Sequence, residues 1–311
     1  MTRYENLFNR LKQGETILID GGTGTEVERR GVPQLKNAWN AGGALTHPDI
    51  MRQIHEDFIN EGAEIVISNT FATSKHLMKD ADCLDDFEKV NRRSVELVVE
   101  ARNNSKNPNA LVAGGISHWS FTNILPSLDE LKTGALEQAT IMKDAGADLI
   151  MLEMMIDVPR MLAVYEGAKA SNLPIWVGLS CEPDGEGTMR LLGGQKDLND
   201  STPNSRIGQT LEEALAALKN TDVPLINIMH TDVTYIDQCL EIVNKHWDRL
   251  VGVYAHSGDD IQMKWTFDDV IAPHDYTNYC KKWMNHKLSI IGGCCGTRPE
   301  HICDLKKNLF S

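Results

Sequence analysis

The sequence contains no apolar run that approaches the roughly 20 residues a helix needs to cross a bilayer. Its first residues, Met1–Glu5, are mostly polar and lack the apolar segment of a secretory signal peptide. We therefore expect a cytoplasmic protein with no membrane partner.

Basic side chains are fewer than acidic ones. The chain carries 31 Lys and Arg against 44 Asp and Glu, which gives a formal net charge of −13. Proteins that bind nucleic acid usually present a basic surface, so a nucleic-acid partner is not expected. Self-association into a homo-oligomer stays open at this stage.

The cysteines do not make up the even set of a secreted disulfide framework. An odd number of scattered thiols is typical of a reduced protein, in which cysteine more often binds a metal or reacts. The seven lie at Cys83, Cys181, Cys239, Cys280, Cys294, Cys295 and Cys303.

No linker of low complexity divides the chain, so we expect one domain over residues 1–311. Short apolar runs alternate with longer helical patterns from end to end, which predicts an α/β fold with a parallel sheet and helices outside it. Eight such units are typical of a (β/α)8 TIM barrel. The predicted strands are Thr16–Asp20, Glu64–Ser68, Leu111–Gly115, Asp148–Glu153, Pro174–Ser180, Pro224–Met229, Leu250–Ala255 and Leu288–Ile291.

Predicted helices fill the intervals between these strands, and two intervals are long and irregular. Those two run from Cys181 to Ile207 and from His256 to His274. Segments that follow the strands of a barrel build its active face, so we expect both to contribute to the site. The helical patterns include Pro48–Glu61, Phe87–Asn103, Ser127–Ala145, Thr210–Lys219 and Tyr235–Lys245.

The most distinctive stretch is Gly-Gly-Cys-Cys-Gly-Thr at residues 292–297, directly after the last predicted strand. Adjacent cysteines rarely close a disulfide, because the ring that they would form is strained. Two thiolates at a strand end suit one soft metal ion, for which Zn²⁺ is the default. The alternative is that Cys294 and Cys295 are two small buried hydrophobic residues.

A glycine-rich turn follows the first strand and begins with Asp20. Such turns can hold phosphate, but no lysine follows, and Asp20 and Glu26 would repel an anion. Glu153 ends the fourth predicted strand after an apolar run, where a buried carboxylate needs a partner. We favour a site in which Asp20 and Glu153 hold an ammonium group and glycine N–H groups face a carboxylate, as an amino acid would require.

His230 ends the sixth predicted strand and is a candidate third metal ligand. A lone histidine at a strand end is more often part of the hydrogen-bonded scaffold. The barrel nevertheless brings the end of this strand near the cysteine pair. Other residues that follow strands are alternative third ligands, namely Cys181, His118 and His256.

The motifs at the two ends of the chain resemble those of the homocysteine S-methyltransferase family. They are Asp-Gly-Gly-Thr-Gly-Thr-Glu at 20–26 with Arg-Gly at 30–31, and Gly-Gly-Cys-Cys-Gly-Thr at 292–297 with Pro-Glu-His-Ile at 299–302. The resemblance runs from about Leu11 to Leu305 and includes Asn-Thr-Phe at 69–71. That family includes betaine–homocysteine and S-methylmethionine–homocysteine methyltransferases.

The resemblance implies a TIM barrel that binds one zinc and makes methionine, by moving a methyl group from a small onium donor to the thiol of homocysteine. The family's third zinc ligand is a cysteine at the end of the sixth strand, where this chain has His230. We therefore expect the metal ligands His230, Cys294 and Cys295, and the substrate-binding residues Asp20, Gly21, Gly22, Thr70 and Glu153.

An onium donor should lie against aromatic rings, because cation–π attraction suits a sulfonium or quaternary ammonium group. Trp119 and Phe121 after the third strand, and Trp265 and Phe267 after the seventh, are candidates. Plain packing is the alternative for each ring. Two other functions stay open: methyl transfer to a different thiol, and a barrel that binds zinc or an amino acid without catalysis.

Overall fold

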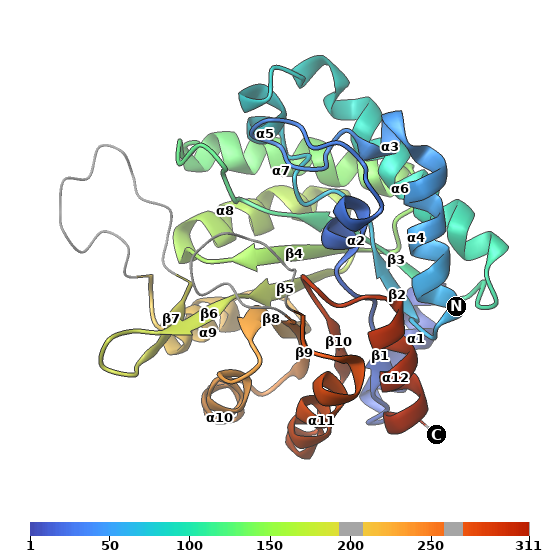
Figure 1. Ribbon diagram of the computed structural model, residues 1–311. Coiled ribbons are helices and arrows are strands. Elements are labelled where there is room, and N and C mark those ends of the chain that lie inside the picture. The colour runs from blue at the N-terminus through green and yellow to red at the C-terminus, as the bar shows by residue number, and fades with distance from the viewer. Residues whose placement is uncertain (193–207, 258–269, 311) are drawn as a thin grey trace.

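The computed structural model describes residues 1–192, 208–257 and 270–310, and its strands form one closed barrel (Figure 1). The eight strands of the main sheet run parallel in the order β1-β10-β9-β8-β5-β4-β3-β2. A bridge between Ile19 and Ile65 joins the two ends of this order. Two backbone hydrogen bonds flank the bridge, from Asp20 N–H to the Ile65 carbonyl and from Glu64 N–H to the Leu18 carbonyl. The predicted (β/α)8 barrel is therefore confirmed.

The strands are short, and each lies close to its predicted position. Nearly all of their apolar residues are buried, on both faces, as expected when a parallel sheet has helices on one side and a filled lumen on the other. The barrel strands are β1 (Ile17–Leu18), β2 (Ile65–Ile67), β3 (Leu111–Ile116), β4 (Leu149–Met155), β5 (Ile175–Leu179), β8 (Leu225–Asp232), β9 (Leu250–His256) and β10 (Ile290–Gly293).

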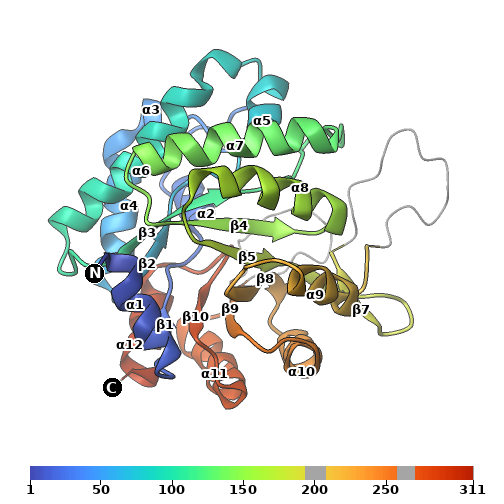
Figure 2. The same cartoon turned by 180° about the vertical axis from the view of Figure 1, so that it is seen from behind.

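The helices form an outer ring, and Figure 2 shows α8, with α7 beyond it, above β4 on the outside of the barrel. Several begin with a clear signal: Ser127 and Thr210 each form a capping box, and Pro48, Pro273 and Pro299 occupy first-turn positions. The helices between strands are α2 (Thr23–Arg29), α3 (Gly43–Thr46), α4 (Pro48–Asn60), α5 (Lys75–Asp80), α6 (Phe87–Asn104), α7 (Leu128–Asp144), α8 (Val158–Ala168), α9 (Leu211–Lys219), α10 (Ile236–His246) and α11 (Pro273–Trp283), and α12 (Pro299–Leu309) ends the described chain.

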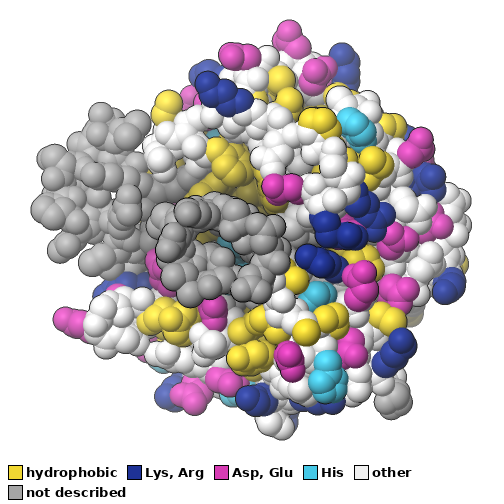
Figure 3. All heavy atoms as spheres, in the orientation of Figure 1, with side chains coloured by type: hydrophobic (Ala, Val, Ile, Leu, Met, Phe, Trp, Pro, Cys, Tyr) yellow, Lys and Arg dark blue, Asp and Glu magenta, His cyan; other side chains and the backbone are white. Residues whose placement is uncertain are grey.

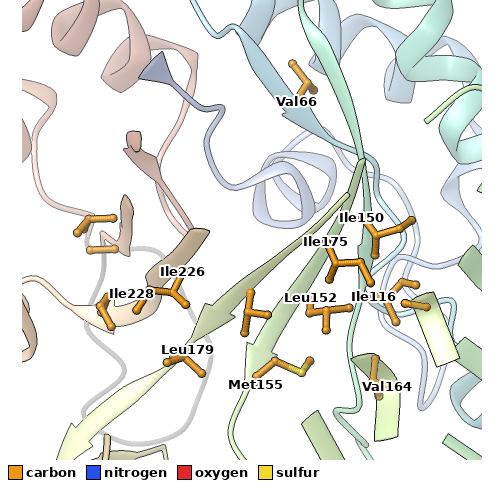
Figure 4. Close-up of a cluster of buried hydrophobic side chains, with 14 of the residues drawn as sticks. Val66, Ile116, Ile150, Leu152, Met155, Val164, Ile175, Leu179, Ile226 and Ile228 are labelled. Carbon is orange, nitrogen blue, oxygen red and sulfur yellow. The ribbon is translucent and has the colours of Figure 1, made fainter. Parts of the chain in front are cut away.

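Two apolar layers stabilise the barrel. The larger fills the space between the sheet and the helices, and Figure 4 shows part of it, where Leu152 and Met155 of β4 lie near Val164 of α8. The smaller fills the lumen with side chains such as Ile17, Trp176 and Ile290. Burial of these side chains is the main favourable contribution to folding, at about 25 cal/mol per Å² of apolar surface.

Helix α1 (Arg3–Lys12) covers the amino-terminal ends of the strands and was not predicted from the sequence. Its Leu7 and Leu11 belong to the same apolar cluster as the lumen residues, and Trp176 Nε1 donates a hydrogen bond to the Tyr4 hydroxyl at 3.2 Å. The lumen is therefore covered at one end, while the carboxyl ends of the strands face the other.

One predicted loop contains regular structure. Residues after β5 form an antiparallel hairpin of β6 (Cys181–Pro183) and β7 (Met189–Leu191). Residues 193–207 of the same predicted loop lie outside the described chain, as do 258–269 of the second predicted loop and with them Trp265 and Phe267. Within the described residues, no helix combines the length and the apolar character needed to cross a membrane.

Candidate functional site

Three potential metal ligands meet at the carboxyl ends of β8 and β10. The Cys294 sulfur lies 3.6 Å from His230 Nδ1 and 3.9 Å from the Cys295 sulfur. One ligand atom from each of the three residues lies within 4.8 Å of the other two, and no other His, Cys, Asp or Glu group in the described chain meets that criterion. Two thiols and an imidazole at this spacing fit a Zn²⁺ ion with an open fourth position.

Irregular backbone directs His230 into this group. The pairing of β8 with β9 shifts between Met229 and Asp232, and His230 has a φ of 43° in the left-handed region. A residue in that conformation departs from the alternating in-and-out pattern of a strand, so a bulge can redirect a side chain next to a site. His230 is 5% exposed and the two cysteines are partly buried, so the ligands are shielded without being sealed.

The cysteine turn is fixed to its neighbours through its backbone. Cys294 N–H donates to the Ala255 carbonyl at 2.9 Å, and Ser257 N–H donates to the Cys295 carbonyl at 2.8 Å. Thr297 Oγ1 donates to the Cys294 carbonyl at 2.6 Å. These bonds hold both thiols on the end of the sheet before any ligand arrives, which is the preorganisation that a metal site requires.

The two thiols differ in acidity. The hydrogen bond between them, together with burial, raises the pKa of Cys294, which donates, well above that of an ordinary thiol. The same bond lowers the pKa of Cys295, which accepts, with a further contribution from His230. One thiolate is therefore favoured in the free protein, and a metal that took both would release a proton.

Two acidic side chains lie beside this group without a cationic partner in the described chain. Asp20 is buried, and one of its carboxyl oxygens accepts a hydrogen bond from Ile67 N–H at 2.8 Å. Burial, and then the charge of Glu153, raise the pKa of Asp20 well above its usual value. Burial, and then the charge of Cys295, raise the pKa of Glu153 to about 8. A buried carboxylate without a partner is costly, so both groups favour a cationic ligand.

A cavity of about 520 Å³ connects the metal group with Glu153, and Asp20 directly precedes Gly21 of its wall. Figure 3 shows hydrophobic side chains in a depression near the centre of this face, with Lys and Arg side chains to its right. The cavity wall joins an apolar, aromatic part to the polar groups already described. Among its lining residues are Gly21, Gly22, Trp39, Phe71, Trp119, Phe121, Glu153, Met154, Met229, His230, Tyr254, Cys294 and Cys295.

The other three predicted substrate-binding residues, Gly21, Gly22 and Thr70, differ in their access to the cavity. The N–H of Gly22 already donates to the Thr297 carbonyl at 3.0 Å, so it is not a free donor for a ligand. Thr70 is fully buried, and its hydroxyl donates to the Gly115 carbonyl at 2.8 Å, while its neighbours Ser68 and Asn69 line the cavity. Gly21 lies in the cavity wall itself.

The alternative third ligands lie outside the metal group. Cys181 begins the β6–β7 hairpin and is buried, with its N–H donating to Thr231 Oγ1 at 2.9 Å. His118 accepts a hydrogen bond from Ile156 N–H at its Nε2, at 3.3 Å. His256 is nearest, since its ring centre lies 5.2 Å from that of His230.

Over residues 17–309 the sequence matches the model of a protein family described as homocysteine S-methyltransferase. The chain belongs to the homocysteine S-methyltransferase family. It is therefore a methyltransferase, as the motifs of its two ends predict.

Relatives of this homocysteine S-methyltransferase family member span nearly its whole length. The chain is 25% identical to selenocysteine Se-methyltransferase of Brassica oleracea var. italica, over 100% of this chain and 94% of that protein. It is 24% identical to homocysteine S-methyltransferase 2 of Arabidopsis thaliana, over 98% of each. The fold is similar to the metallated form of the Escherichia coli homocysteine methyltransferase MmuM, with a TM-score of 0.75 and 22% identity over 97% of this chain and 99% of that one.

Two aromatic residues of this family member's cavity were not singled out from the sequence as donor-binding candidates. Trp39 comes from the segment after α2, and Phe71 from the turn after β2, and their rings meet edge to face at 6.5 Å. Trp39 lies so close to Gly24 that any side chain at Gly24 would collide with the indole ring. In the local sequence, only Gly24 indicates that another group approaches this turn closely. It does not indicate that the group is Trp39.

Proposed function

We propose that this enzyme transfers a methyl group from a small onium donor, such as S-methylmethionine, betaine or a related sulfonium, to the thiol of homocysteine, giving methionine. The observation that carries the proposal is one cavity lined by a soft-metal ligand group, by Glu153 and by an aromatic wall, with Asp20 next to Gly21 of the cavity wall. Neither carboxyl group has a cationic partner among the described residues. Each part matches one part of the two substrates: a thiol, an ammonium group and an onium centre.

The proposed cofactor is Zn²⁺, which His230, Cys294 and Cys295 would hold. Their chemistry fits, because thiolate and imidazole are the ligands of catalytic zinc sites that keep one position open. When bound, the ion supplies Lewis acidity that lowers the pKa of the acceptor thiol.

The acceptor's amino group is assigned to Asp20 and Glu153. Glu153 lines the cavity, and Asp20 lies directly beside Gly21 of the cavity wall. An ammonium group between the two carboxylates would offset the burial and the charge of Glu153 that together raise the pKa of Asp20. This contact would fix the orientation of the acceptor, so that its thiol faces the cysteine pair.

The onium donor is assigned to the aromatic wall formed by Trp39, Phe71, Trp119 and Phe121. Trp119 and Phe121 also meet nearly edge to face, with ring centres 6.4 Å apart. Ring faces attract a desolvated cation by about 2 kcal/mol in favourable cases. The acceptor reacts as a thiolate, after its thiol proton has been released to solvent. Its sulfur forms a bond to the methyl carbon while the bond from that carbon to the onium sulfur or nitrogen breaks. The donor then leaves as a neutral group.

A panel of donors tests this proposal directly. Purified protein with a measured zinc content would receive homocysteine and, in separate reactions, S-methylmethionine, betaine and a dimethylsulfonium acid, each with a deuterated methyl group. We expect labelled methionine, detected by mass, from at least one donor. Binding of both zinc and homocysteine without product from any donor would contradict the proposal and favour a non-catalytic binding protein.

A second acceptor is favoured by one comparison. A relative that aligns with the whole chain is a selenocysteine Se-methyltransferase, which suggests that the acceptor in this subfamily varies. The same reactions with cysteine and selenocysteine in place of homocysteine would distinguish the two. A larger kcat/KM for either of them would make homocysteine the lesser substrate.

His230→Ala is expected to weaken zinc binding, because the metal group would lose one of its three ligands. His230→Cys should retain zinc, since it supplies a third thiolate. The added negative charge should raise the pKa of the bound acceptor thiol and shift the pH–rate profile to higher pH. Zinc content and the pH profile of the three proteins check this. If His230→Ala keeps both zinc and turnover, His230 is scaffold, and His256, His118 or Cys181 becomes the candidate ligand.

A further inference from the structure

Tyr254 lines the cavity, and its hydroxyl group is buried without a hydrogen-bond partner among the described residues. Tyr254 lies near the end of β9 and is 2% exposed, and its hydroxyl bonds to no residue that the structure describes. Tyr276 is a contrasting case, because its equally buried hydroxyl bonds to the carbonyls of Ala255 and Gly292 at 3.0 and 2.8 Å. Buried polar groups nearly always form a hydrogen bond, so an exception indicates a partner that binds from outside the chain.

A glycine in strand β5 leaves space for this hydroxyl. A Cβ atom on Gly178 of β5 would lie 2.8 Å from the Tyr254 oxygen and 2.6 Å from Cγ of Met229. A glycine in mid-strand usually marks a close approach of another group. Phenylalanine would fill most of the same volume without leaving a polar atom unsatisfied, so packing alone does not explain the hydroxyl.

The groups around Tyr254 are those of the proposed acceptor site. Burial raises the pKa of this phenol well above its usual value, with further contributions from Glu153, Cys294 and Asp20. The hydroxyl is therefore protonated and can donate a hydrogen bond. These three neighbours are residues assigned to the two ends of homocysteine, the amino group and the sulfur. The acceptor offers two hydrogen-bond acceptors, its sulfur and the carboxylate at its amino-acid end, with only methylene groups between the two ends. The interaction of Tyr254 with Cys294 favours the sulfur.

We propose that Tyr254 donates a hydrogen bond to the sulfur of the bound acceptor thiol, and so acts as a substrate-binding residue of the methyl-transfer site. This inference rests on the proposed function. The bond would be strong to a thiolate and weak to a thioether, because a charged acceptor strengthens a hydrogen bond and a thioether sulfur is a poor acceptor. Tyr254 would therefore favour homocysteine over methionine and help the product to leave.

The test is Tyr254→Phe, which removes only the hydroxyl. Titration calorimetry on zinc-loaded protein would measure the Kd of homocysteine and of methionine. We expect the homocysteine Kd to rise roughly 10- to 100-fold, as for loss of a hydrogen bond to a charged group, and the methionine Kd to stay unchanged. The melting temperature of the ligand-free variant should equal or exceed that of the wild type, because an unsatisfied buried hydroxyl has been removed.

Tyr276→Phe is the matched control, since it removes a buried hydroxyl that has partners, and it should lower the melting temperature. Equal homocysteine affinity in Tyr254→Phe and wild type would overturn the inference. An equal loss of affinity for homocysteine and for methionine would also overturn it, because the hydroxyl would then contact the amino-acid end of the ligand. If wild-type protein with a full complement of zinc does not bind homocysteine, the proposed function fails, and this inference fails with it.

Discussion

Cys294→Ala and Cys295→Ala are each expected to purify without stoichiometric zinc and without methyl-transfer activity. Each change removes one of the three ligand atoms that lie within 4.8 Å of one another. Loss even of a residue that only supports a ligand typically costs 10- to 100-fold in metal affinity, so loss of a ligand should cost more than about 100-fold. Metal analysis by mass spectrometry, with protein quantified on the same sample, measures the effect.

Cys280→Ala separates metal loss from damage to packing. Cys280 lies on α11, is fully buried in the outer apolar layer, and is not part of the metal group. This variant should lose some stability, through the cavity that it leaves, and keep its zinc. Full zinc in both Cys294→Ala and Cys295→Ala would show that the adjacent cysteines are core residues after all.

Asp20→Asn and Glu153→Gln are expected to raise the KM for homocysteine far more than they change zinc content. Removal of one partner of a buried charge pair typically costs about 2–5 kcal/mol, which is roughly 30-fold to several thousand-fold in affinity. A simple thiol without an amino group serves as the control substrate, because its KM should be the same in wild type and variants. If wild-type enzyme uses that thiol as well as homocysteine, the two carboxylates do not bind an amino group.

Glu153→Gln should weaken homocysteine binding, but it should also make the folded, metal-free protein lose less stability as pH rises. Glu153 has a pKa of about 8 in the folded, metal-free protein, against an ordinary value of 4.5. The folded state therefore holds its proton more tightly than the unfolded chain, and stability is lost as pH rises through that interval, by up to about 1.4 kcal/mol per pH unit. Denaturant unfolding of metal-free protein at pH 5 and pH 9 should show a smaller loss for Glu153→Gln than for wild type.

Much of the barrel could be predicted from the sequence, because its strands are apolar on both faces. Runs such as Leu149–Leu152 are continuous rather than alternating, and they recur between helical patterns. Helix α1 and the β6–β7 hairpin were missed for different reasons. The helix begins almost at the first residue, before any strand gives it context. The hairpin strands have only three residues each, too few for a period to be read.

The candidate site was predictable where topology alone decides proximity. Strand ends of a parallel barrel gather on one face, so His230, Cys294, Glu153 and Asp20 could be placed together without coordinates. Their individual roles stay predictions. Trp39 could not be placed, because it reaches the cavity through an irregular segment and a contact with Gly24. The unsatisfied hydroxyl of Tyr254 could not be found either, since satisfaction of a polar group depends on every neighbour in three dimensions.

The left-handed backbone at position 230 limits which residues can evolve there. Such a conformation strains β-branched side chains most and is entered most readily by glycine, Asn, Asp and His. Asp and His from that set are also metal ligands. A change at this residue is therefore least strained among a few types, two of which can keep a metal bound. Cysteine is a further ligand type and, because it is not β-branched, avoids the strongest of these penalties. The bulge in β8 thus makes exchange of one ligand for another a short evolutionary path, and loss to a bulky β-branched residue a strained one.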